Sequence, residues 1–210
     1  MAEAAARRVK TTRAPGDRAR ARVAEQAARL ATVEGLEGLS IGRLAEVTGV
    51  PKSSVHALFG SKQDLQLATI RAARDSFIAE VVAPALAAGD PGLARLRAYC
   101  EGFLSYVERR VFPGGCFFVA VGAEVGGRPG AVHDEVAHIQ QLWRDLMLQE
   151  VQAAIDAGEL PADEDAAQLA FELGAILVGT NIVSVLHDDF AVIDRARTAV
   201  RNRLGTTPPR

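Results

Sequence analysis

Residues 40–62 read SIGRLAEVTGVPKSSVHALFGSK. This stretch predicts two short helices joined by a tight turn and followed at once by a third helix. Ser40 is a good N-cap because its hydroxyl can accept a backbone N–H of the first turn. Gly49 stands where a left-handed residue would end the first helix, and Pro51 suits the first turn of the next, where its missing N–H costs nothing. The pattern is that of a helix-turn-helix, which places one helix in the major groove of DNA.

Apolar stripes at helical spacing define which faces of these two helices are exposed. The stripes consist of Ile41, Leu44 and Ala45 in the first helix and of Val55, Leu58 and Phe59 in the second. The second helix therefore turns small and basic polar groups outward, namely Lys52, Ser53, Ser54 and His56. Such groups suit base edges and phosphates. Amphipathic helix pairs with a glycine turn also occur in helical proteins that do not touch DNA, so neighbouring features must decide.

The charge of the chain is divided unevenly. Residues 1–62 hold 11 Lys/Arg against 6 Asp/Glu, whereas residues 63–210 hold 13 against 20. A basic N-terminal part on an acidic remainder is the footprint expected of a phosphate-binding surface. Residues 1–16 lack apolar periodicity and are expected to form a disordered basic arm, which either attracts DNA phosphates or merely solubilises the chain.

The start of the third helix adds an anion site. The spacing of Ser61 and Asp64 predicts a variant capping box, in which Asp64 reaches back to the Ser61 N–H. The helix N-terminus and Lys62 together favour a negatively charged occupant, for which a DNA phosphate is the natural candidate.

A helix predicted from about residue 18 to 34, the segment Gly35-Leu36-Glu37-Gly38 and the motif above together resemble the N-terminal DNA-binding domain of the TetR family of bacterial transcriptional regulators. The resemblance covers roughly residues 18–75. It implies that residues 48–50 form the corner of the motif and that Lys62 contacts a phosphate. The chain departs from the family at His56 and Ala57, where tyrosine and histidine are common, so His56 could add a pH-sensitive contact. The DNA-binding residues predicted are Arg18, Ser40, Arg43, Thr48, Lys52, Ser53, Ser54, His56 and Lys62.

The composition predicts an all-α fold with a three-helix DNA-binding domain and a larger C-terminal helical domain. The expected division is a basic arm over 1–16, the helix-turn-helix domain over 17–62, an effector-binding and dimerisation domain over 63–204, and a flexible tail over 205–210. No run looks apolar enough to cross a bilayer, and the charged N-terminus does not resemble a signal peptide. A cytoplasmic, nucleoid-associated protein is therefore expected. Its two cysteines, Cys100 and Cys116, are expected to be buried reduced thiols, although a redox pair stays open.

Turn residues and apolar periodicity set the expected helices of the C-terminal part. Pro84 should kink or break the helix that starts at Lys62, because proline lacks an N–H and crowds the turn at Glu80. The pair Asp90-Pro91 should open the next helix. The expected helices cover about 62–82, 90–110, 116–125, 131–157, the stretch from the acidic residues 163–165 to about 187, and 190–204.

The helix that ends near residue 187 is apolar almost all round, which predicts burial on two sides. One side would pack on its own domain and the other on a second subunit. The resemblance supports this, because family members are usually homodimers joined through their last two helices; a core helix in a monomer is the alternative. Such a dimer would present two recognition helices about 34–36 Å apart to a palindromic operator. The predicted interface contains Leu173, Gly174, Ile176, Leu177, Ile182, Val183 and Val200.

Helical bundles hold ligands between facing helices, in sites lined by apolar groups with a few polar ones. A small, mostly apolar effector is therefore predicted to bind among residues of the middle and C-terminal helices. Plain core packing is the alternative for each of these side chains. The candidates are Phe103, Tyr106, Cys116, Phe117, Phe118, Val121, Trp143, Leu146, Met147, Thr180 and Asn181.

Sequence motifs give catalysis no support. The chain contains no nucleophile elbow and no P-loop. His133 and His138 would lie about 140° apart around a helix, too far for one metal ion. Neither a metal nor a cofactor is expected. The favoured function is a ligand-responsive repressor that an effector releases from its operator, and the alternative is a helical ligand-binding protein that no longer reads DNA.

Overall fold

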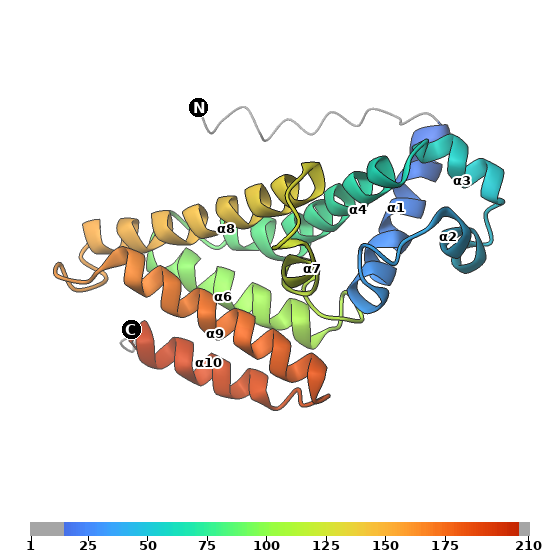
Figure 1. Cartoon of the computed structure of the whole chain (residues 1–210). Helices are drawn as coiled ribbons and strands as arrows, with labels where there is room; N and C mark the ends of the chain where they lie inside the picture. Colours follow the sequence, from blue (N-terminus) through green and yellow to red (C-terminus); the bar gives the residue numbers. More distant parts are fainter. Residues whose placement is uncertain (1–14, 206–210) are drawn as a thin grey trace.

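The computed structural model describes residues 15–205, which form helices joined by short loops and no strand (Figure 1). Residues 1–14 of the predicted arm and 206–210 of the predicted tail lie outside this part. We call residues 15–62 the head and residues 78–205 the body. The elements are α1 Pro15–Glu34, α2 Ile41–Thr48, α3 Lys52–Phe59, α4 Lys62–Phe77, a π-helical turn Ile78–Val82, α5 Ala83–Leu86, α6 Leu93–Glu108, α7 Phe117–Val125, α8 Ala131–Asp156, α9 Ala166–Leu186 and α10 Val192–Arg203.

The head is the predicted helix-turn-helix. The Ser40 hydroxyl accepts the Arg43 N–H at 3.1 Å, and Gly49 ends α2 with a φ of 68°. Arg20 fixes α1 to α3, because its Nε donates to the Leu58 carbonyl at 3.0 Å while its guanidinium lies over the Phe59 ring. These contacts set the angle between the helices and leave the outer side of α3 open.

Helix α4 begins at Lys62 with Ser61 as its N-cap, as expected, but two predicted details of helix starts need correction. The Asp64 carboxylate does not accept the Ser61 N–H; that N–H donates to the Phe59 carbonyl, and Asp64 accepts the Ser61 hydroxyl instead, at 2.7 Å. Asp90-Pro91 does not open α6. Gly92 precedes its first residue with a φ of 138°, and two distant carboxylates hold this end of the helix: Glu150, 58 residues away, accepts the Gly92 N–H, and Glu159 accepts the Leu93 N–H.

Helix α4 connects the head to the body and changes its winding before Pro84. The turn Ile78–Val82 is π-helical, so the Ala83 N–H donates to the Ile78 carbonyl five residues earlier. A widened turn accommodates a proline that removes a donor and crowds the preceding turn. This confirms the predicted irregularity, which lies directly after the last residue of α4.

Helix α9 is more apolar than the sequence reading allowed. By length and composition it could span a membrane, with a mean hydropathy of 1.9 over 18 residues. It instead packs against α6, α8 and α10, with Leu169, Leu173 and Leu177 buried in the bundle (Figure 1). Its other side leaves large apolar groups at the surface, among them Phe171, which is 70% exposed.

Candidate DNA-binding surface and effector cavity

The outer side of α3 carries the predicted recognition residues. Val55 and Phe59 are buried against the head, with exposed fractions of 0% and 4%. The opposite side presents Lys52, Ser53, Ser54 and His56 to solvent. Arg18 is likewise exposed, near the start of α1. Contact of these side chains with DNA stays a prediction, and their placement suits insertion of α3 into a major groove.

Three other predicted DNA-binding residues have intramolecular partners. Ser40 caps α2, as described above. The Thr48 hydroxyl donates to the Leu44 carbonyl at 2.6 Å. Arg43 donates to the carboxylates of Glu34 and Glu46, and the bond to Glu34 is the main reason that the Arg43 pKa is raised. Glu46 lies at i+3 from Arg43 on α2, a spacing that the sequence shows, whereas Glu34 belongs to α1 and was not predicted as a partner.

Lys62 lies at the surface but is held by the loop between α1 and α2. Its Nζ donates to the Glu37 carbonyl at 2.8 Å and to the Glu37 carboxylate at 3.1 Å. The Glu37 carboxylate accepts hydrogen bonds from Gln66 and Lys62, and both lower its pKa. The contribution of Gln66 is the larger one. The Lys62 ammonium has three N–H donors, and Glu37 accepts from it at two oxygens, so a phosphate that binds Lys62 competes with Glu37 or uses the remaining donor.

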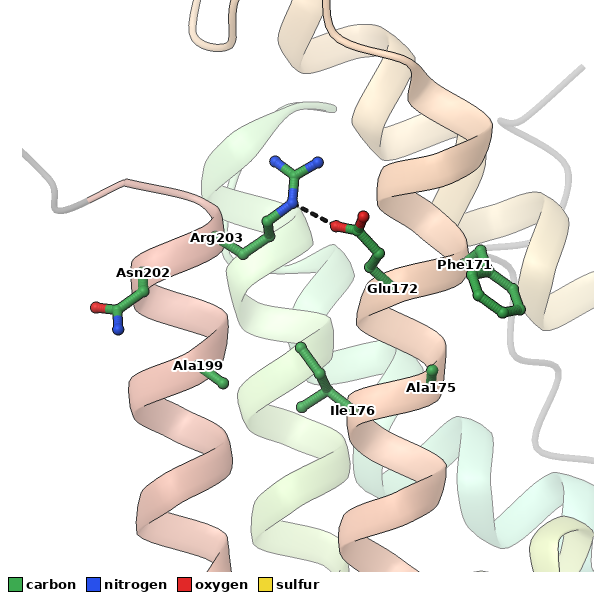
Figure 2. Close-up of a pocket in the computed structure, with 7 residues that line it drawn as sticks. All are labelled: Phe171, Glu172, Ala175, Ile176, Ala199, Asn202 and Arg203. Atoms are coloured by element: carbon green, nitrogen blue, oxygen red, sulfur yellow. Dashed lines mark hydrogen bonds and ion pairs between the residues drawn. The ribbon is translucent and has the colours of Figure 1, made fainter.

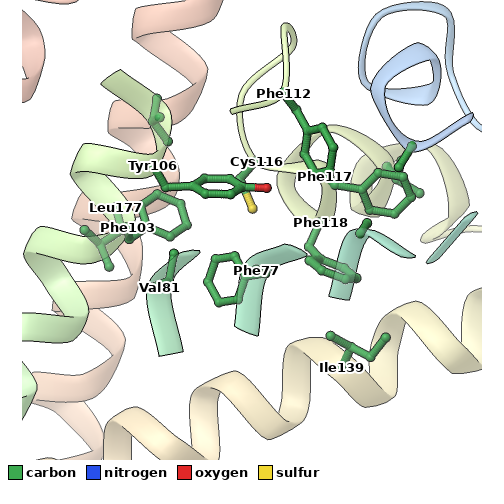
Figure 3. Close-up of a cluster of buried hydrophobic side chains, with 14 of the residues drawn as sticks. Phe77, Val81, Phe103, Tyr106, Phe112, Cys116, Phe117, Phe118, Ile139 and Leu177 are labelled. Carbon is green, nitrogen blue, oxygen red and sulfur yellow. The ribbon is translucent and has the colours of Figure 1, made fainter. Parts of the chain in front are cut away.

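A cavity of about 740 Å³, open to the surface on one side, lies between α4, the π-helical turn, α6, α7, α8 and α9. Its size is that of a site for a drug-sized molecule. The Phe77 and Trp143 rings meet edge-on with centroids 5.1 Å apart, and Phe103 and Phe118 gather around Phe77 (Figure 3). Of the predicted effector residues, those that line the cavity are Phe103, Cys116, Phe118, Trp143, Leu146 and Met147.

The other predicted effector residues do not line this cavity. Tyr106, Phe117 and Val121 are at most 1% exposed and belong to the packed core. The Thr180 hydroxyl donates to the Ile176 carbonyl at 2.6 Å, and Asn181 Oδ1 accepts the Cys116 N–H at 2.7 Å, so backbone groups occupy both polar side chains. Sequence reasoning missed other parts of the wall, namely Phe77, Ile78 and Val82 before Pro84, Phe171 and Val178 on α9, and Arg74 and Arg144.

Both cysteines are unpaired and buried. Burial raises the pKa of Cys116 from 9.0 to about 11 and that of Cys100 to about 12. At pH 8 the thiolate fraction of Cys116 is then about a hundredfold below that of an ordinary cysteine. We expect Ellman's reagent to label the native protein at least about a hundredfold more slowly than the urea-unfolded chain. Rapid labelling of folded protein at pH 8 would contradict the raised pKa values.

The apolar residues exposed on the outer face of α9 are only partly those of the predicted dimer interface. Leu173, Leu177 and Val200 are buried within the chain's own core, with exposed fractions of at most 7%, and leave no surface for a partner. Gly174 lines the cavity, and Ile176 lines a groove between α9 and α10 (Figure 2). The exposed apolar residues of this face are Phe171, Val178, Ile182, Val183, Val185 and Leu186.

Phe171 contributes to both the cavity wall and the exposed apolar face of α9. It points to the side of the helix away from α10, whereas Arg203 of α10 is paired with Glu172 across the groove (Figure 2). Because Phe171 also lines the cavity, the cavity wall and the exposed apolar face share this side chain.

Comparison with known proteins identifies the chain's relatives. A family profile for the "Tetracyclin repressor-like, C-terminal domain" matches residues 92–200, about half of the chain. A second, described as "Bacterial regulatory proteins, tetR family", matches residues 23–69, which contain the helix-turn-helix. The chain belongs to the TetR family. TetR-family proteins are transcriptional regulators rather than enzymes.

Individual relatives agree with the TetR assignment. The chain is 29% identical over 140 residues to the transcriptional regulator AcuR of Cereibacter sphaeroides. This match covers 66% of this chain and 64% of AcuR, so the chain spans just under two thirds of the length of that relative. A TetR regulator from Chloroflexus aurantiacus J-10-FL superposes with a TM-score of 0.82 at 26% identity, over 91% of this chain and 96% of that one. AibR, solved in complex with isovaleryl coenzyme A and operator DNA, shares the fold with a TM-score of 0.68 at 20% identity, over 87% of this chain and 97% of AibR.

Proposed function

We propose that this TetR-family regulator is a repressor that binds a palindromic operator as a homodimer and is released by a small, mostly apolar effector. One observation carries the proposal. Helix α4 begins beside the recognition helix at Lys62 and ends in the cavity wall at Phe77. A single rigid element therefore touches both the surface suited to DNA and the cavity suited to a ligand.

The mechanism follows from this connection. Residues 17–62 act as the DNA-binding domain and residues 63–204 as the effector and dimer domain. An effector that binds better to a body with a displaced α4 shifts the population toward that arrangement, and the spacing of the two recognition helices changes with it. The operator is then released. Operator binding places the protein on the bacterial nucleoid in the cytoplasm, where the predicted basic arm adds phosphate attraction.

The dimer is proposed to form through the exposed face of α9. We expect Ile182→Asp to convert the dimer to monomer, because two copies of a buried, unpaired carboxylate would face each other across the two-fold axis. Leu86→Asp is the matched control, since Leu86 is 47% exposed and Ile182 48%. Sedimentation velocity at micromolar concentration measures the outcome. A native chain that sediments as a monomer, or an Ile182→Asp variant that stays dimeric, would refute this interface.

The repressor function is tested with the chain's single tryptophan. Trp143 lines the cavity, so ligand entry should alter its fluorescence. Apolar compounds found by this signal are then added to the protein bound to a fluorescent operator duplex. Compounds that bind the cavity should release the duplex. Cavity binding by a protein that holds no specific duplex would instead support the ligand-binding alternative.

A further inference from the structure

The Glu124 carboxylate of the body accepts hydrogen bonds from backbone N–H groups of the head. Glu124 lies near the end of α7, and its side chain reaches the loop between α1 and α2. Its Oε2 accepts the Leu36 N–H at 2.7 Å and its Oε1 accepts the Glu37 N–H at 2.7 Å. One carboxylate thus accepts short hydrogen bonds from two consecutive backbone N–H groups, which holds the loop in one orientation.

The loop is shaped to receive this carboxylate. Gly35 has a φ of 82°, a conformation that glycine adopts without strain. A Cβ at Gly35 would lie 3.2 Å from both Glu124 oxygens. A glycine at this position therefore allows the carboxylate to approach the two N–H groups closely.

The other end of α7 forms part of the effector cavity. Phe118 and Val119, in the first turn of the helix, line the cavity wall. Glu124 follows Val119 by five residues, about one and a half turns. A regular helix this short moves as one piece, so an effector that presses on its first turn displaces Glu124 as well.

The contact continues from the loop to the predicted phosphate-binding lysine. Glu37 offers its N–H to Glu124 and its carbonyl and carboxylate to Lys62. Gln66 of α4 also donates to the Glu37 carboxylate, at 3.0 Å. One residue of the loop thus joins the body helix α7 to the N-terminal turn of α4.

We propose that Glu124 is a positioning residue through which α7 couples the cavity to the head, as a second connection beside α4. Displacement of α7 by a ligand loosens the α1–α2 loop and changes how firmly Glu37 holds Lys62. The effect of this coupling on regulation rests on the proposed function. The coupling between the cavity and the α1–α2 loop does not.

Hydrogen exchange at the Leu36 and Glu37 amides tests the connection without DNA or effector. In Glu124→Gln one N–H would face an amide donor, so exchange of these two amides should rise about tenfold, as expected for loss of a charge-assisted bond. Glu101→Gln is the control, because Glu101 pairs with Arg197 wholly within the body. It should leave both amides unchanged.

The cavity end is tested with a substitution that fills space in place of a ligand. Val119→Trp adds bulk to the cavity from α7, and Leu142→Trp adds it from α8. Val119→Trp should raise exchange at Leu36 and Glu37 about threefold or more, and the increase should vanish when Glu124→Gln is already present. Leu142→Trp should cause no such increase. Should Val119→Trp fail to unfold cooperatively, Val119→Phe takes its place.

The outcomes separate this inference from the proposed function. Two results would overturn the coupling: unchanged hydrogen exchange at Leu36 and Glu37 in the folded Val119 variant, or an increase in exchange that persists when Glu124→Gln is present. Amides that respond as expected in a chain that selects no DNA sequence would uphold the coupling and reject the repressor.

Discussion

A variant carrying Lys52→Ala and Lys62→Ala is expected to bind the proposed operator about a thousandfold more weakly than the native protein. Both lysines are exposed, and the proposed dimer would lose four phosphate contacts in total. Each lost contact reduces the slope of log K against log salt by about 0.9. The slope should therefore fall by about 3.6, measured by fluorescence anisotropy from 50 to 300 mM salt.

The matched control removes the same charge from the body. Arg109 is exposed at the C-terminal end of α6 and Arg195 is exposed on α10, so Arg109→Ala with Arg195→Ala should leave the salt slope nearly unchanged. Equal slopes for the lysine variant and the native protein would show that Lys52 and Lys62 do not contact phosphates. Equal losses in both double variants would indicate attraction by overall charge only.

Glu150→Ala is expected to lower the free energy of unfolding by about 3–5 kcal/mol, the range for breaking a buried ion pair. The Glu150 side chain is 3% exposed and accepts the Arg95 Nε at 2.9 Å and the Gly92 N–H at 3.0 Å. Its removal leaves a mostly buried guanidinium and a backbone N–H without their acceptor. Urea unfolding followed by circular dichroism measures the loss.

An exposed pair provides the comparison for Glu150. Glu46 pairs with Arg43, but its side chain is 71% exposed, so Glu46→Ala should cost less than about 1 kcal/mol. A Glu150→Ala variant as stable as Glu46→Ala would mean that the start of α6 does not depend on this carboxylate.

The head could be predicted closely because its signals are local. Ser40 and Gly49 act within their own turns, and the apolar stripes of α2 and α3 pack against each other at short range. The same local reasoning failed where a distant group takes over. Glu150 accepts the Gly92 N–H at the start of α6 from 58 residues away in the sequence. Glu124 accepts the Leu36 and Glu37 N–H groups from 88 and 87 residues away, and no sequence spacing reveals contacts at such separations.

The cavity was predictable in its location but not in its individual walls. Phe117 and Phe118 are adjacent, so they point in directions about 100° apart on α7, and only Phe118 faces the cavity. On α9 apolar residues occur on all sides, so periodicity could not separate Leu173, which is buried in the core, from Phe171, which is exposed. Orientation at such helices is decided by packing partners rather than by pattern.

The central claim is that this chain reads a specific DNA sequence as a two-fold dimer. The most direct test is selection of duplexes from a random pool by the purified protein at moderate salt, read by sequencing. We expect an inverted repeat whose half-sites lie about one helical turn, or a multiple of it, apart. Recovery of no motif, with only weak salt-sensitive binding, would contradict the claim.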